Sequence, residues 1–259
     1  MNNWLVNQDE WLVYALTIMV LLGAVEGGVL LARYRHRHGL RESEQFLSVL
    51  AAPSIGLLAL MVGFTFSLAL TRFEARKAAV LDEANAIGTA ALRGRMLADP
   101  YRDAVGPMFK EYARLRVVGR GWRIDSAENV AAMRRSLTIQ DALWDQAVAA
   151  AKADPRQVPT GLFVQSLNDM IDMSETRLTA ARNHVPGIVF FMLEGIAVVG
   201  LGFTGYGAAQ AATQHRIAML VMAVMIASVI TLVFDLDSPQ NGLITVSQQP
   251  LMDLIQGIG

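Results

Sequence analysis

Two carboxylates lie inside long apolar stretches of the sequence, where charge is otherwise absent. Glu26 is the only charged residue between Trp11 and Ala32, and Glu194 is the only one between Val185 and Gln214. A bare carboxylate in hydrocarbon is costly unless it is neutralised or partnered. Each of these groups could line an ion path or form a hydrogen bond between helices, and the sequence leaves both roles open.

A second pattern is a repeat of apolar residues, four apart, that ends in a cation: Gly56, Leu60, Phe64, Leu68 and Arg72. Residues four apart lie on one face of an α-helix. If several copies surround an axis with this face inward, Leu60 and Phe64 form apolar rings that exclude water and block ions. Arg72 would then ring the pore mouth and attract anions. The alternative is an ordinary lipid-embedded helix, which is apolar on every face.

Charged and amide side chains in the middle of the chain suggest a structural network. Asn168, Asp169 and Asp172 share one face of a predicted helix and could bond the charged stretch that follows Arg72. We favour this structural role over a metal site. The predicted polar network consists of Arg76, Glu83, Asn168, Asp169 and Asp172.

Composition and motifs exclude several classes of protein. The 22 Lys and Arg nearly balance the 23 Asp and Glu, so the net charge of −1 argues against binding to nucleic acid. No P-loop, H-E-x-x-H or G-x-S-x-G motif is present. The chain has no cysteine, which removes thiolate metal sites and cysteine nucleophiles. We therefore expect neither an enzyme nor a cofactor.

The elements that must position these residues are four apolar stretches, at about 11–32, 46–71, 185–210 and 217–234. The chain is 53% hydrophobic and only 17% charged, where soluble domains have about 25% charged residues. About 20 residues of helix cross a bilayer, so these stretches predict four transmembrane helices. The first 10 residues contain no Lys or Arg, so we interpret the first stretch as a retained anchor and not a signal peptide.

The residues between the second and third stretches have helical patterns and enough polar side chains to be hydrated. Residues 72–97 continue the second helix, and Asp125 to Glu128 has the form of a capping box that starts another helix. The predicted fold is an all-α membrane protein with four transmembrane helices in two pairs. Its expected parts are a helix pair in 1–71, a helical soluble domain in 72–184, a second pair in 185–236 and a tail in 237–259.

The second stretch also resembles a known family. The segment from Gly63 to Arg76, with Gly-Phe near the middle of the helix and Arg followed by an aromatic residue, resembles the second helix of bestrophins. The order of short helix pair, large domain and second pair is similar too. Three further segments resemble a bacterial bestrophin-like family of unknown function: Asp82–Thr89, Asn168–Asp172 and Asp235–Gly242.

This resemblance implies a homopentameric ion channel whose second helices line an apolar neck. Leu60 and Phe64 would be neck residues, and Gly56 falls one turn along, where the family often has a bulky residue. The implied partners are the lipid bilayer, other copies of the chain and inorganic ions, with anions such as chloride favoured over cations. The alternative is a non-conducting membrane sensor or scaffold that uses its helical domain for signalling or partner binding.

The resemblance bears on metal binding and on location. Some bestrophins hold Ca²⁺ with an acidic run after the fourth helix, but here only Asp235 and Asp237 follow it. They are weak candidates, so no metal is predicted.

The expected location is the bacterial inner membrane, with several spans. Basic residues near the membrane are equally numerous on both sides, so the positive-inside rule does not decide the orientation. The resemblance favours a cytoplasmic helical domain.

Overall fold

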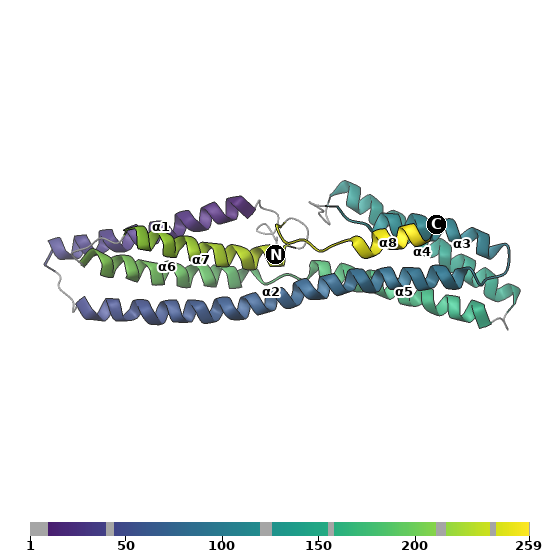
Figure 1. Cartoon of the computed structure of the whole chain (residues 1–259), viewed down its shortest axis with the longest axis horizontal. Coiled ribbons are helices and arrows are strands. Elements are labelled where there is room, and N and C mark those ends of the chain that lie inside the picture. Colours follow the sequence, from purple (N-terminus) through teal and green to yellow (C-terminus); the bar gives the residue numbers. More distant parts are fainter. Residues whose placement is uncertain are drawn as a thin grey trace. The chain divides into compact units, whose positions relative to one another are not determined.

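The computed structural model describes residues 10–39, 44–119, 126–154, 158–210, 216–238 and 242–258. Over these residues the chain is helical and contains no strand (Figure 1), which confirms the predicted all-helical class. The helices are α1 (Glu10–Arg37), α2 (Glu44–Gly94), α3 (Tyr101–Arg116), α4 (Ala127–Ala153), α5 (Val158–Arg182), α6 (Gly187–Gln210), α7 (Arg216–Asp237) and α8 (Gln249–Gly257).

The chain divides into two compact units. Unit 1 comprises Met1–Thr71 and His184–Leu243, and unit 2 comprises Arg72–Asn183 and Ile244–Gly259. Helix α2 is continuous and contributes its first part to unit 1 and its second part to unit 2.

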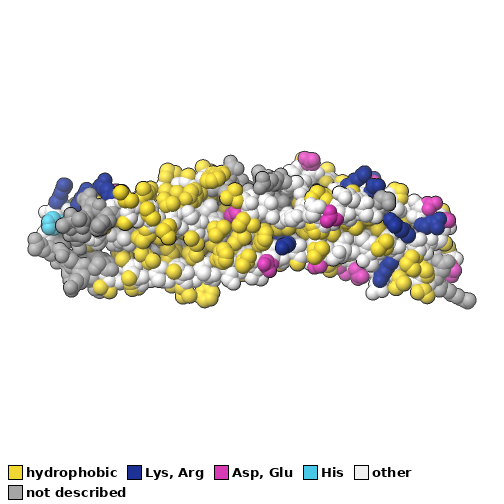
Figure 2. Space-filling view, viewed as in Figure 1, with side chains coloured by type: hydrophobic (Ala, Val, Ile, Leu, Met, Phe, Trp, Pro, Cys, Tyr) yellow, Lys and Arg dark blue, Asp and Glu magenta, His cyan; other side chains and the backbone are white. Residues whose placement is uncertain are grey.

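Unit 1 contains the most apolar helices of the protein. By length and composition, four helical stretches of the described chain can cross a bilayer, and they lie within Trp11–Arg37, Val49–Gly94, Val158–Ala209 and Arg216–Asp237. Figure 2 shows hydrophobic side chains over the surface of α1, α2, α6 and α7. A helix that is apolar on all sides lies either in a lipid bilayer or in a protein core. Because these helices carry their hydrophobic side chains on the surface, they indicate a membrane protein.

Helices α1 and α6 approach each other closely because glycines remove the side chains between them. A Cβ atom added at Gly28 would overlap the carbonyl oxygen of Gly202 and lie 2.9 Å from the backbone nitrogen of Tyr206. A Cβ at Gly205 would likewise overlap the backbone of Val25. Small residues at such contacts are the usual means by which membrane helices pack.

Replacing Gly28 by alanine should therefore push α1 away from α6. Overpacking of this kind costs about 1–3 kcal/mol, and the clash is with backbone, which cannot rotate aside. We expect a lower melting temperature of the purified protein in detergent. Gly27→Ala is the matched control, since among the described residues nothing outside the backbone of α1 lies within 4 Å of its added Cβ. Equal melting temperatures for the two variants would contradict this account of the contact.

Unit 2 is built around an apolar core that every one of its helices joins. Phe109 of α3, Leu143 of α4 and Phe163 of α5 are fully buried there with Ile87 of α2. The N-terminus of α4 is capped by Ser126, whose side chain accepts a hydrogen bond from the backbone nitrogen of Asn129. The expected capping box began one residue earlier, at Asp125, which lies outside the described residues.

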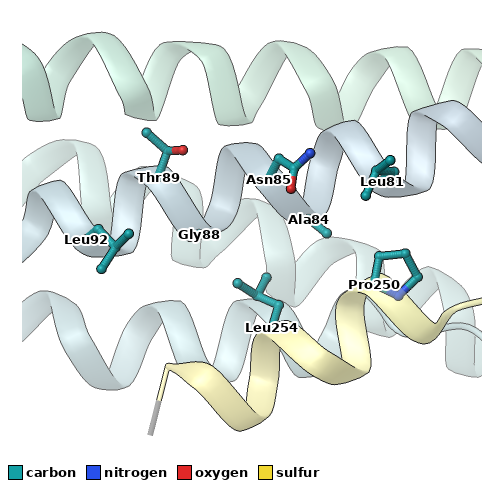
Figure 3. Close-up of a pocket in the computed structure, with 8 residues that line it drawn as sticks. All are labelled: Leu81, Ala84, Asn85, Gly88, Thr89, Leu92, Pro250 and Leu254. Carbon is teal, nitrogen blue, oxygen red and sulfur yellow. The ribbon is translucent and has the colours of Figure 1, made fainter.

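The C-terminal segment contains a helix, α8, that packs against the second part of α2. Leu251 is fully buried in the core of unit 2. Figure 3 shows Pro250 and Leu254 of α8 facing α2. Together with residues of α2 they line a groove of about 510 Å³. A Cβ at Gly88 would lie 3.1 Å from a methyl group of Leu254, so the glycine allows α8 to sit close. Residues 237–259, expected as a tail, thus hold an ordered helix.

Candidate functional site

The predicted stripe on α2 lies on the face of the helix that the rest of the chain leaves open. Leu58, Thr65 and Ala69 are buried and mark the inward face of α2 in unit 1. Leu60 and Phe64 are 56% and 66% exposed. At 3.6 residues per turn, these two residues fall on the side away from the buried ones. The structure thus brings the two proposed neck residues together on one open face.

Helix α2 is also the least enclosed of the apolar helices. In the most apolar 18-residue segment of α2, only 11% is buried within the chain. In the corresponding segments of α1 and α7, 33% is buried. Apart from the backbone of α2 itself, no atom of the described residues lies within 4 Å of a Cβ added at Gly56 or Gly63. The open face of α2 is therefore available for lipid, for water or for another copy of the chain. The pore-lining role of Gly56, Leu60 and Phe64 stays a prediction.

The predicted pore-mouth cation, Arg72, is only partly accessible. Its side chain is half-buried, and its Nη1 atom is buried without a hydrogen-bond partner in the described part of the chain. Two residues on, Glu74 is exposed. A charge acts on passing ions only where water can reach it, so Glu74 is a second candidate, beside Arg72, for a charge that sets the potential at this end of the stripe.

The two intramembrane carboxylates differ in their surroundings. Glu26 is exposed on α1, and a Cβ added at Gly23 or Gly27 would meet no atom of the other described residues within 4 Å, the backbone of α1 itself excepted. Glu194 of α6 is half-buried, and its Oε1 atom is buried without a hydrogen-bond partner among the described residues. Because a carboxylate in a bilayer is costly unless it is partnered or neutralised, both groups remain candidates for contacts with another copy, a proton or an ion.

Glu83 forms the centre of a buried ionic cluster in unit 2. Its side chain is completely buried, and its two oxygens accept hydrogen bonds from Arg116, at 2.6 Å, and from Arg177. Arg177 also donates to the side-chain oxygen of Gln248, at 2.9 Å. Two guanidinium groups share one carboxylate, so the cluster links α2, α3 and α5 with the segment before α8.

A neutral pair lies beside this cluster. The buried Tyr112 hydroxyl accepts a hydrogen bond from Gln140, at 2.8 Å. Burial raises the pKa of Tyr112 above its ordinary value, so the phenol stays neutral. A raised pKa for an acid means that alkaline conditions, above the pKa of the unfolded chain, act against the fold.

Arg76 has a different role from the one expected. It is buried, and its guanidinium donates to the backbone oxygens of Ala180 and Asn183, at 3.2 and 2.8 Å. These oxygens lie at the C-terminal end of α5, where carbonyls lack helical partners and a positive charge is favourable. Arg76 therefore caps α5.

The other predicted network members are not gathered with Arg76 and Glu83. The side chains of Asn168, Asp169 and Asp172 are exposed on α5. The carboxylate of Glu83 is instead engaged by arginines that the sequence did not point to. One signal was available, because Arg116 continues the buried face of α3 formed by Val105, Phe109, Tyr112 and Ala113.

Asp235 and Asp237, the weak metal candidates, are buried at the end of α7. Asp237 accepts hydrogen bonds from the backbone nitrogen of Val185, at 3.0 and 3.1 Å, and Asp235 accepts one from that of Leu243, at 2.7 Å. His184 also contacts Asp237. These carboxylates therefore fix the chain before α6 and after α7. No group of three metal-binding side chains occurs among the residues described.

These features define a helical membrane protein with an open apolar helix and a polar helical unit. The sequence matches the family model described as a Bestrophin-like domain over residues 19–251. Because this match covers most of the chain, the protein belongs to the bestrophin-like family. The resemblance of the second helix to bestrophins is thereby confirmed at the level of the family. No curated protein matches the sequence.

The fold is similar to that of a bacterial bestrophin homologue from Klebsiella pneumoniae. Its crystal structure shares 13% sequence identity, covers 95% of this chain and 94% of that chain, and has a TM-score of 0.65. A tryptophan-to-alanine variant of that homologue gives a TM-score of 0.69 at 13% identity, with 95% of each chain covered. At such low identity, these similarities establish the fold alone.

Proposed function

We propose that the protein is a homo-oligomeric ion channel of the bestrophin type, with α2 lining the pore. The observation that carries the proposal is the open apolar stripe of α2, in which Leu60 and Phe64 lie away from the buried face of the helix. In a ring of subunits, this face would form the narrow apolar neck. Rings of large apolar side chains hold back ions by excluding water.

A lipid-facing role for the same stripe is the competing explanation. Family membership favours the pore, because the chain shares its fold with a bacterial bestrophin homologue over nearly its whole length. The small residues on the open side of α2, Gly56 and Gly63, suit close approach of neighbouring copies, as glycines do in membrane helix packing.

The sign of the conducted ion depends on the charges at the end of the neck. Arg72 favours anions such as chloride, and this is the preference that we propose. Its half-buried position weakens its field, and the exposed Glu74 opposes it. We place the protein in the bacterial inner membrane with its helical unit in the cytoplasm, on the basis of the family.

A cysteine in the neck tests both the ring and the position of α2. The chain has no native cysteine, so Phe64→Cys introduces a single reactive site. In a narrow neck, two such cysteines lie close enough to form a disulfide. We expect oxidant-dependent covalent dimers on a denaturing gel and a protein mass in detergent of about five times 28.2 kDa.

Phe191→Cys is the matched control for this experiment. Phe191 of α6 is 65% exposed, nearly the same as Phe64, but it belongs to a helix that we do not place at the axis. We expect no cross-linking there. A monomer or dimer in detergent, or equal cross-linking at both positions, would remove the pore and favour the non-conducting sensor or scaffold.

A further inference from the structure

A pocket in unit 1, separate from the open face of α2, lies between the start of α1 and the end of α7. Its volume is about 300 Å³. Its polar and aromatic lining comes from Trp11 and Tyr14 of α1 and from Ser228, Thr231 and Asp235 of α7. None of these residues belongs to the proposed neck, so the pocket calls for its own explanation.

Two aromatic rings form adjacent walls of this pocket. The rings of Trp11 and Tyr14 have centroids 6.5 Å apart and meet at 76°. The Tyr14 hydroxyl lies 3.1 Å from the hydroxyl of Ser228, which holds the ring against α7. Aromatic rings in a pocket lining favour a bound cation, because the face of each ring carries negative electrostatic potential.

The part of the lining that comes from α7 adds oxygen atoms. Thr231 Oγ1 is buried without a hydrogen-bond partner in the described part of the chain, and leaving such a group unsatisfied is costly. Asp235, which accepts a hydrogen bond from the backbone nitrogen of Leu243, adds the negative charge of a carboxylate that is only 3% exposed. A primary ammonium group carries three N–H donors, so it can satisfy the threonine oxygen. A quaternary ammonium group carries none.

The position of the pocket along the helices indicates where such a cation comes from. The apolar spans of α1 and α7 begin at Trp11 and end at Asp237 respectively, so the pocket lies where both spans leave the hydrocarbon. Trp and Tyr concentrate at this level of a bilayer, beside the lipid headgroups. The remaining lining residues, Leu232 and Leu243, are apolar and 40% and 70% exposed, which suits contact with lipid.

We propose that this pocket binds the primary ammonium headgroup of a phospholipid of the ethanolamine class. The ammonium group lies against the faces of Trp11 and Tyr14 and donates a hydrogen bond to Thr231. The carboxylate of Asp235 supplies the opposite charge. The lipid tails remain in the bilayer, and the site selects ethanolamine over choline because only the former donates hydrogen bonds.

Native mass spectrometry of the full-length protein in detergent tests this proposal. Dioleoyl phosphatidylethanolamine and dioleoyl phosphatidylcholine, which differ only in the headgroup, are added separately at equal concentration. We expect the ethanolamine lipid to bind about tenfold more tightly, as one charge-assisted hydrogen bond allows. Thr231→Val, which keeps the shape of the side chain, should remove most of this preference.

Two further arms distinguish the pocket from general lipid adhesion. Trp11→Leu should weaken binding of the ethanolamine lipid about tenfold, while Trp144→Leu in unit 2 should leave it unchanged. Free ethanolamine in large excess should displace the lipid, whereas equimolar potassium chloride should not. Equal affinity for the two lipids in the native protein, or an unchanged preference in Thr231→Val, would overturn the proposal.

Discussion

In the proposed pore, replacing Phe64 by alanine should let ions pass more freely. With α2 lining the pore as proposed, the substitution would remove a phenyl ring from every subunit at the same level of the neck, and the bore would widen and fill with water. Alanine is the best helix former, so α2 should persist. We expect ion flux into liposomes to rise by at least about tenfold, which corresponds to a barrier lowered by about 1.4 kcal/mol.

Phe191→Ala is the control for this prediction. Phe191 is 65% exposed and Phe64 is 66% exposed, so the two variants lose similar apolar surface. Only the residue in the neck should change the flux. Because Phe64 is not part of the core of its own chain, its loss should cost little of the 3–5 kcal/mol that is typical of buried aromatic truncations. A Phe64→Ala protein with a native melting temperature and background flux would contradict the pore.

The same conducting variant reports the sign of the ion. In a salt gradient, the reversal potential measures the preference for anions over cations. A ring dominated by Arg72 gives an anion preference that is strongest at low ionic strength, where screening is least. A cation preference in this measurement would assign the dominant charge to the exposed Glu74.

Replacing Glu83 by glutamine should strongly destabilise unit 2. The carboxylate is completely buried between Arg116 and Arg177, and glutamine would leave two guanidinium groups without a counter-charge. Breaking a buried ion pair from one side costs about 3–5 kcal/mol. We expect a large fall in the melting temperature of the full-length protein, together with faster proteolysis of the segment that holds α8, because Arg177 also holds Gln248.

Asp82→Asn is the matched control, since Asp82 is the preceding residue on α2 and is exposed. It removes the same charge from the same helix without touching the cluster. We expect it to change the free energy of unfolding by no more than about 0.5 kcal/mol, as is usual for surface substitutions. The melting temperature should therefore stay close to that of the native protein. Similar losses in the two variants would show that net charge, and not the buried cluster, controls the stability of unit 2.

The sequence by itself determined the helical class and the four apolar spans, because hydropathy and helical period are local properties of the chain. It also determined which residues share one face of α2, since residues four apart must lie together on a helix. The resemblance of Gly63–Arg76 to the bestrophin second helix likewise depends only on residues that are neighbours in the sequence. Local rules did not settle every position: proline usually interrupts a helix, yet α3 continues through Pro107, with Phe109 and Tyr112 buried in the core.

Only the tertiary structure decided the partners of the polar residues. Glu83 meets Arg116 and Arg177, which lie 33 and 94 residues away along the chain. Arg76 caps α5 across a separation of more than 100 residues. The same holds for the glycines, because the contacts of Gly28 with α6 distinguish it from its open neighbour Gly27. The contacts of a charged residue or a glycine depend on the residues that the fold brings next to it. Such contacts produce no periodic pattern in the sequence.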